Sequence, residues 1–174
     1  MTRTNHTKKL VYGALFAALA CVATMSIHIP TPGTGGYIHP GDAFVVLSGI
    51  VLGPVYGSLA AGIGSALADF IGGYYIYVPI TFTVKFIIAA VVALIYRKAS
   101  HAGLKKIPSC IICGIFSTLF VAGGYCFFEY FLYGTAAFAS VPSNLIQGIS
   151  GLIFSTLLLP VVSRIPDFTD YMHA

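Results

Sequence analysis

Long apolar segments fill most of the chain, and short stretches rich in Gly, Pro or charged residues separate them. A helix needs about 20 mainly apolar residues to cross the hydrocarbon core of a bilayer. The pattern therefore predicts one all-α integral membrane domain over residues 1–174. We expect a bundle of six transmembrane helices, with spans at about residues 9–27, 41–53, 55–72, 80–97, 108–132 and 141–163.

The apolar stretch at residues 41–72 decides between five spans and six. As a single helix it would measure roughly 48 Å, far more than a hydrocarbon core of about 30 Å. Gly53-Pro54 supplies a turn inside it. With six spans and both termini in the cytoplasm, every Lys and Arg except Lys85 lies on the cytoplasmic side, as the positive-inside rule requires: Arg3, Lys8, Lys9, Arg97, Lys98, Lys105, Lys106 and Arg164.

Composition excludes several classes of function. Only 8% of the residues are charged and the mean hydropathy is +0.91, whereas soluble domains carry roughly 25% charged residues. The chain has no room for a soluble catalytic domain, so we expect neither an enzyme nor a nucleic-acid partner. It has no Walker-type phosphate loop for hydrolysing ATP. Cys110 and Cys113 form a single C-x-x-C pair, which we interpret as small buried side chains and not as a metal site.

Several charged and amide residues lie near the outer ends of the predicted spans: Asp42, Asp69, Lys85, Glu129, Asn144 and Gln147. At about 1.5 Å of rise per residue, all of them fall within roughly 10 Å of the outer boundary. An ionisable residue inside a membrane costs about 2.5–3.5 kcal/mol on insertion scales and marks a candidate functional site. The sequence therefore predicts a site near the outer surface.

Lys85 and Glu129 are the central candidates, and two interpretations stay open for them. They form a structural ion pair with each other, or they contact a ligand. The side chains one helical turn away, or on a shared face of the sixth span, favour a substrate-binding pocket: Thr81, Tyr125, Asn144 and Gln147. This mixture of charge, amide and aromatic groups suits a small polar heteroaromatic ligand.

The remaining acidic residues and the outer loops have simpler interpretations. Asp42 follows Pro40-Gly41 and is predicted to cap the helix that begins there. Asp69 is predicted to anchor an outer loop. The first outer loop, residues 28–40, carries Tyr37 and His39, which we expect to help cover the pocket as a lid. An aromatic belt at the membrane interface is the alternative for the loop tyrosines.

Small residues mark one further surface. Ala14 and Ala18 form an A-x-x-x-A motif in the first span, close to the basic N-terminus. Small residues at this spacing let helices approach closely. We therefore expect Ala14 and Ala18 to contact a partner protein.

Taken together, these features resemble the substrate-binding S component of an energy-coupling factor (ECF) vitamin transporter. The resemblance covers nearly the whole chain: six short spans, the Ala14-x-x-x-Ala18 motif, and a Gly-rich stretch from Gly41-Asp42 through Gly53-Pro54-Val55-Tyr56-Gly57 to Asp69. That stretch is most similar to the riboflavin, pyridoxine and hydroxymethylpyrimidine branches. The resemblance implies a multi-pass protein in the plasma membrane of a prokaryote.

The resemblance also implies partners and a binding region. Ala14 and Ala18 would dock on a transmembrane coupling subunit that two ATPase subunits drive, so ATP would be used only by the partners. A vitamin would bind near the outer surface, through spans four to six and the first loop, where Lys85, Glu129 and the amide residues stand. The chain itself is expected to need no cofactor.

The chemistry of these side chains favours particular vitamins. A carboxylate suits a protonated ring nitrogen or an amine, a Lys suits a phenolate, and amides suit hydroxymethyl groups. Pyridoxine or another vitamin B6 form fits best, with hydroxymethylpyrimidine close behind. The alternative function is a self-sufficient secondary transporter or ion channel that uses Lys85, Glu129 and Asp69 as a relay.

Overall fold

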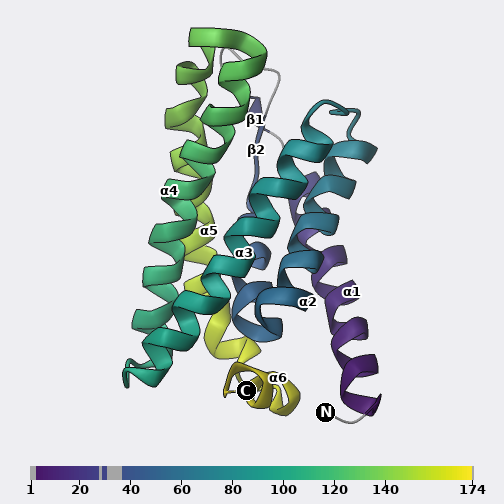
Figure 1. The fold of residues 1–174 in the computed structure, drawn as a ribbon, viewed down its shortest axis with the longest axis vertical. Coiled ribbons are helices and arrows are strands. Elements are labelled where there is room, and N and C mark those ends of the chain that lie inside the picture. The colour runs from purple at the N-terminus through teal and green to yellow at the C-terminus, as the bar shows by residue number, and fades with distance from the viewer. Residues whose placement is uncertain (1–2, 28, 31–36, 174) are drawn as a thin grey trace.

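The computed structural model describes residues 3–27, 29–30 and 37–173, which form a bundle of long helices (Figure 1). In chain order the elements are α1 (Arg3–Ser26), β1 (Ile29–Pro30), β2 (Tyr37–Ile38), α2 (Asp42–Ile71), α3 (Tyr77–His101), α4 (Lys106–Tyr133), the 3-10 helix η1 (Gly134–Ser140), α5 (Val141–Val162) and α6 (Pro166–His173). Both chain termini lie at one end of the bundle, beside α6. We call this the terminal end, and the opposite end, toward which β1 and β2 lie, the strand end.

Four helical stretches in the described residues are long and apolar enough to cross a membrane: His6–Ser26, Asp42–Ile71, Tyr77–His101 and Lys106–Val162. The last of these contains both α4 and α5, which η1 joins. The prediction of a helical protein with helices able to span a membrane is therefore confirmed.

A break at Gly53 divides α2 into two segments, residues 42–52 and 54–71. Gly53 has φ 80° and ψ −174°, a conformation that side chains disfavour and glycine tolerates. Ser48 Oγ donates a hydrogen bond to the carbonyl oxygen of Gly57 at 3.1 Å. In a straight helix these residues would lie about 13.5 Å apart, so the two segments fold back on each other. The missing side chain of Gly57 makes room for the backbone of Ser48.

The core of the bundle is built around α2. In the most apolar part of each helix, 72% of the α2 residues are buried, against 22% for α1. Val46 and Val51 of α2 and Ile88 and Val92 of α3 are fully buried in one cluster. By contrast, α1 presents most of its surface outward.

The structure contains more helix than the predicted spans, both at the ends of the spans and between and after them. Helix α3 begins at Tyr77 and ends at His101, beyond the predicted 80–97, because a helix continues past the hydrocarbon core that set the expected length. Residues 134–140, expected to be loop, form η1. The chain also ends in a short helix, α6, that was not predicted. The Gly- and Pro-rich part of the first outer loop, with His28, lies outside the described residues.

Candidate functional site

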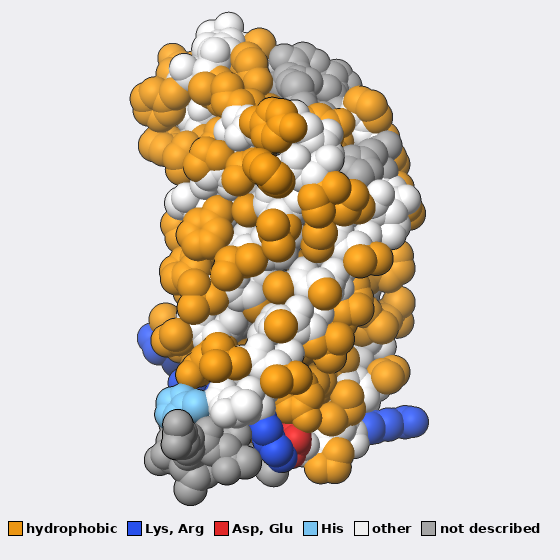
Figure 2. All heavy atoms as spheres, turned by 90° about the vertical axis from the view of Figure 1, so that its right-hand side faces the viewer, with side chains coloured by type: hydrophobic (Ala, Val, Ile, Leu, Met, Phe, Trp, Pro, Cys, Tyr) orange, Lys and Arg blue, Asp and Glu red, His pale blue; other side chains and the backbone are white. Residues whose placement is uncertain are grey.

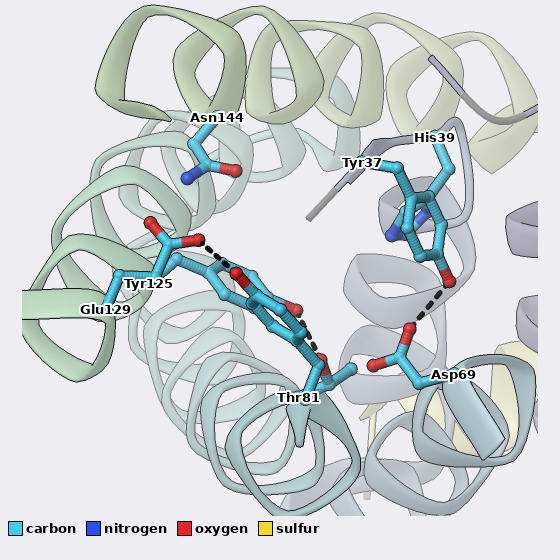
Figure 3. Close-up of a pocket in the computed structure, with 8 residues that line it drawn as sticks. Tyr37, His39, Asp69, Thr81, Tyr125, Glu129 and Asn144 are labelled. Carbon is cyan, nitrogen blue, oxygen red and sulfur yellow. Dashed lines mark hydrogen bonds between the residues drawn. The ribbon is translucent and has the colours of Figure 1, made fainter. Parts of the chain in front are cut away.

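A small polar cavity lies where five parts of the chain converge (Figure 3). Its lining residues come from β2 and the residue after Ile38, and from helices α2 to α5: Tyr37, His39, Asp69, Tyr77, Thr81, Tyr125, Glu129 and Asn144. Most of them stand at the strand end of their helices. The space open to the centre of a water molecule is about 20 Å³, which is room for about one water. In this structure the cavity is therefore too small to hold a vitamin.

Glu129 is the charged centre of one wall. Its side chain is only 2% exposed. Tyr77 donates a hydrogen bond to Glu129 Oε1 at 3.0 Å, and the Ser140 hydroxyl donates to Oε2. Asn144 Nδ2 in turn donates to Ser140 Oγ at 3.3 Å. Both carboxylate oxygens of Glu129 therefore accept hydrogen bonds from hydroxyl groups.

The neighbouring wall is formed by Thr81 and Tyr125. Their hydroxyl groups are hydrogen-bonded at 2.9 Å, and both side chains are buried. The Lys85 ammonium lies 5.2 Å from the centre of the Tyr125 ring, within the range of a cation–π contact. Lys85 therefore contacts the Tyr125 ring without lining the cavity itself.

The opposite wall is formed by Tyr37, His39 and Asp69 (Figure 3). Tyr37 donates a hydrogen bond to Asp69 Oδ1 at 2.6 Å, and its ring lies 4.5 Å from that of Tyr74. Burial and the neighbouring Asp69 carboxylate raise the pKa of Tyr37 above its usual range, so the hydroxyl stays protonated and able to donate. The predicted role of Asp69 as a loop anchor is confirmed.

His39 is held as a neutral ring. Its Nδ1 accepts a hydrogen bond from the backbone N–H of Gly41 at 3.1 Å and lies 3.2 Å from Thr24 Oγ1. Because a backbone N–H only donates, Nδ1 carries no proton, and the proton of the ring is on Nε2. The cavity therefore gains a polar wall at His39 without a positive charge.

A second polar cluster, which we call the ion-pair cluster, consists of Asp42, Lys85 and Gln147. Lys85 Nζ lies 2.5 Å from Asp42 Oδ1, with both side chains fully buried. Gln147 Nε2 donates to Asp42 Oδ2 at 3.1 Å. The prediction that Asp42 caps its helix is wrong, because Gly41 occupies the cap position and the carboxylate turns inward to Lys85. The alternative of a Lys85–Glu129 ion pair is also wrong, since each residue has other partners.

The structure brings most of the predicted substrate-binding residues together around the cavity: Tyr37, His39, Thr81, Tyr125, Glu129 and Asn144. Lys85 and Gln147 instead belong to the ion-pair cluster and are absent from the lining. Sequence reasoning missed Asp69 and Tyr77 as lining residues. Tyr77 was assigned to a loop, and the signal that would have found it is its position one turn before Thr81.

Within the described residues, no group of three or more His, Cys, Asp or Glu side chains is arranged to hold a metal ion. All four cysteines are free thiols, and Cys110 and Cys113 are buried. This agrees with the interpretation of the C-x-x-C pair as packing residues.

The predicted partner-binding residues lie on a different face. Ala14 and Ala18 are exposed on α1 and line an apolar groove of about 620 Å³ between α1 and the second segment of α2. Figure 2 shows the face of the molecule on which α1 lies. It is almost wholly apolar, and its Lys, Arg, Asp and Glu side chains gather near the terminal end.

Comparisons with known proteins assign the family. The family model of the ECF-type riboflavin transporter S component matches residues 4–164. An uncharacterised protein of Pyrococcus woesei is 33% identical over 133 residues, covering 76% of this chain and 86% of that protein. The crystal structure of the S component for biotin from an ECF-type ABC transporter has a similar fold, with a TM-score of 0.71 and 22% identity over 99% of both chains.

The resemblance predicted from the sequence is thus confirmed by a match over nearly the whole chain. The family and the fold are those of transporter subunits and not of enzymes. This chain belongs to the family of S components of ECF-type riboflavin transporters.

Proposed function

We propose that this chain is the substrate-capture subunit for uptake of a small water-soluble vitamin or precursor, with a vitamin B6 form or hydroxymethylpyrimidine as the cargo. The observation that carries the proposal is the cavity at the strand end. It combines carboxylate, amide, hydroxyl and aromatic groups from five parts of the chain, which is how sites for small polar ligands are built. Riboflavin, the cargo in the family's name, is larger than these compounds and would require the cavity to expand further.

Binding requires the cavity to expand. Ligand pockets commonly measure about 300–1,000 Å³, so we interpret the cavity of about 20 Å³ as a covered state that opens before binding. The Tyr37–Asp69 hydrogen bond joins the first outer loop to α2. Breaking it would let Tyr37 and His39 move away together as a lid.

The test of this function is calorimetric titration of the detergent-purified chain with pyridoxine, pyridoxamine, hydroxymethylpyrimidine, riboflavin, pantothenate and niacin. Sub-micromolar binding of one compound is the expected result. Absence of binding across the panel, by protein shown to be folded and free of co-purified ligand, would refute a vitamin-capture role.

We further propose six membrane spans, with the break at Gly53 as the turn between the second and third, in the plasma membrane of a prokaryote. Both termini would face the cytoplasm, which puts the cavity near the outer surface. Cysteine labelling from either side of sealed vesicles tests this topology. Labelling of Ala139→Cys from the outside and of Ala102→Cys only after permeabilisation is expected.

The partners in this proposal are a transmembrane coupling subunit and two ATPases, and Ala14 and Ala18 form the docking surface. Their exposure beside an apolar groove supports the assignment, since a helix can approach small residues closely. Ala14→Leu or Ala18→Leu should abolish co-purification of the complex and leave vitamin binding intact. Ala139→Leu, the same change on exposed η1, is the matched control. Unchanged co-purification of Ala14→Leu would contradict this assignment.

The alternative function, a self-sufficient transporter or ion channel, finds less support. Its relay needs Lys85, Glu129 and Asp69 in one path, but Lys85 is bound to Asp42. Liposomes that contain only this chain should therefore neither accumulate vitamin nor conduct ions. Uptake by the chain alone would favour the alternative.

A further inference from the structure

Positive charge is scarce in the part of the protein that holds the cavity. The sequence contains nine Lys and Arg residues in total. Apart from Lys85, they lie in the N-terminal part of α1, between the last turns of α3 and the first residue of α4, or after α5. Lys85 is thus the sole Lys or Arg within the helices at the depth of the cavity.

Lys85 does not compensate the carboxylates of the cavity. Its ammonium pairs with Asp42 at 2.5 Å, and both groups are fully buried. Glu129 forms no ion pair with any residue that the structure describes, and it accepts hydrogen bonds from the hydroxyl groups of Tyr77 and Ser140. The described residues that line the cavity include no Lys or Arg, and His39 is neutral.

The cavity has the features that favour a cation. Glu129 and Asp69 place carboxylates on opposite walls (Figure 3). The rings of Tyr37, Tyr77 and Tyr125 also line it, and the faces of aromatic rings attract positive charge. Glu129 is buried and has no ion pair among the described residues, so it pays a desolvation cost that a bound cation offsets.

We infer that the cavity selects cargo by charge: the ligand presents a positively charged nitrogen to Glu129, and vitamins that carry a carboxylate are rejected. The inference rests on the vitamin-capture function proposed above and narrows its substrate class. Among the vitamin B6 forms it favours pyridoxamine, whose aminomethyl group is protonated at neutral pH. Asp69 adds negative potential from the opposite wall.

The experiment is a calorimetric series at pH 7.4 on the full chain in detergent, with ligands grouped by charge. The cations are pyridoxamine and thiamine, the neutral compounds are pyridoxine, hydroxymethylpyrimidine and riboflavin, and the anions are 4-pyridoxate, biotin and pantothenate. We expect a cation to bind most tightly, and pyridoxamine to bind at least roughly tenfold more tightly than 4-pyridoxate, which differs in the charge of one ring substituent.

The outcomes separate this inference from the proposed function. Tightest binding of a neutral compound or an anion would overturn charge selection and leave vitamin capture standing. If folded and ligand-free protein binds no compound of the panel, both charge selection and vitamin capture are overturned.

A pair of variants locates the selecting group. Glu129→Gln should reduce the preference for pyridoxamine over 4-pyridoxate to about threefold or less. Tyr77→Phe removes a hydrogen bond to the same carboxylate but keeps its charge, so it should weaken all ligands and preserve their order. An unchanged preference in Glu129→Gln would overturn the assignment to Glu129. If that variant fails to fold, the ligand series on the unmodified chain still decides whether charge is selected.

Discussion

The ion-pair cluster and the cavity use the same kinds of side chain to opposite effect. Asp42, Lys85 and Gln147 bind one another across α2, α3 and α5, and the charges of the acid and the base cancel. In the cavity, Glu129 is bound only by hydroxyl groups among the described residues. The comparison teaches that a buried charge by itself does not mark a binding site. What marks one is a buried charge whose compensation is incomplete.

The largest expected effect comes from breaking the self-compensated cluster. Lys85→Met leaves Asp42 buried without its counterion, and loss of one partner of a buried pair costs about 3–5 kcal/mol. The free energy of unfolding, measured in detergent by denaturant titration, should fall by that amount. Adding Asp42→Asn to Lys85→Met removes the stranded charge and keeps a partner for Gln147, so it should recover most of the loss. A double variant as unstable as the single one would show that the pair does not act as a unit.

The next effect comes from removing the uncompensated charge. Glu129→Gln should weaken vitamin binding roughly 100-fold, about 2.7 kcal/mol, while the free energy of unfolding changes by about 1 kcal/mol or less. This is the reverse of the result for Lys85→Met. Titration calorimetry and thermal unfolding of the same preparation measure both quantities. Wild-type affinity in Glu129→Gln would remove Glu129 from the site.

A smaller effect is expected on the opposite wall. Tyr37→Phe keeps the ring but loses the hydrogen bond to Asp69, and bonds to charged groups contribute about 1.5–3 kcal/mol. Loss of this anchor should favour the open loop and increase the rate of ligand release about tenfold or more, measured by stopped-flow displacement. Tyr75→Phe, at an exposed tyrosine of the α2–α3 connection, is the control. Equal release rates in the two variants would argue against a lid.

The smallest effect belongs to an exposed ion pair at the terminal end. Lys8 lies 3.1 Å from Asp167, and the two side chains are 48% and 33% exposed, so solvent screens them. Hydrogen bonds from Tyr12 and Lys8 lower the pKa of Asp167 below its ordinary value of 3.8. The stabilisation is therefore complete well above pH 3.8 and is lost as the pH falls through the lowered pKa. Asp167→Asn should melt slightly earlier than the unmodified chain at pH 7, and thermal melts at a series of pH values should show this difference shrinking as the pH falls below 3.8.

Sequence reasoning placed the candidate residues at a common depth, but it did not identify which of them form an ion pair with each other. Counting residues along each span places Lys85, Glu129 and Asn144 at one level, because helical rise is constant. It does not tell which way each helix is turned. The choice of Asp42 over Glu129 as partner of Lys85 depends on the reversal at Gly53, which returns the first segment of α2 to the centre of the bundle. Tyr77 was missed for another reason. Helix α3 begins at Tyr77, ahead of the predicted span 80–97, whose length was set by the thickness of the hydrocarbon core.

The closed cavity has a consequence for the membrane itself. In the part of the chain that the structure describes, a space for about one water offers no continuous file of water molecules for protons and small ions to follow. Elsewhere in the bundle, the helices pack around fully buried Val and Ile side chains. A cell could therefore keep many idle copies of this protein in its membrane without dissipating the gradients that power its other work.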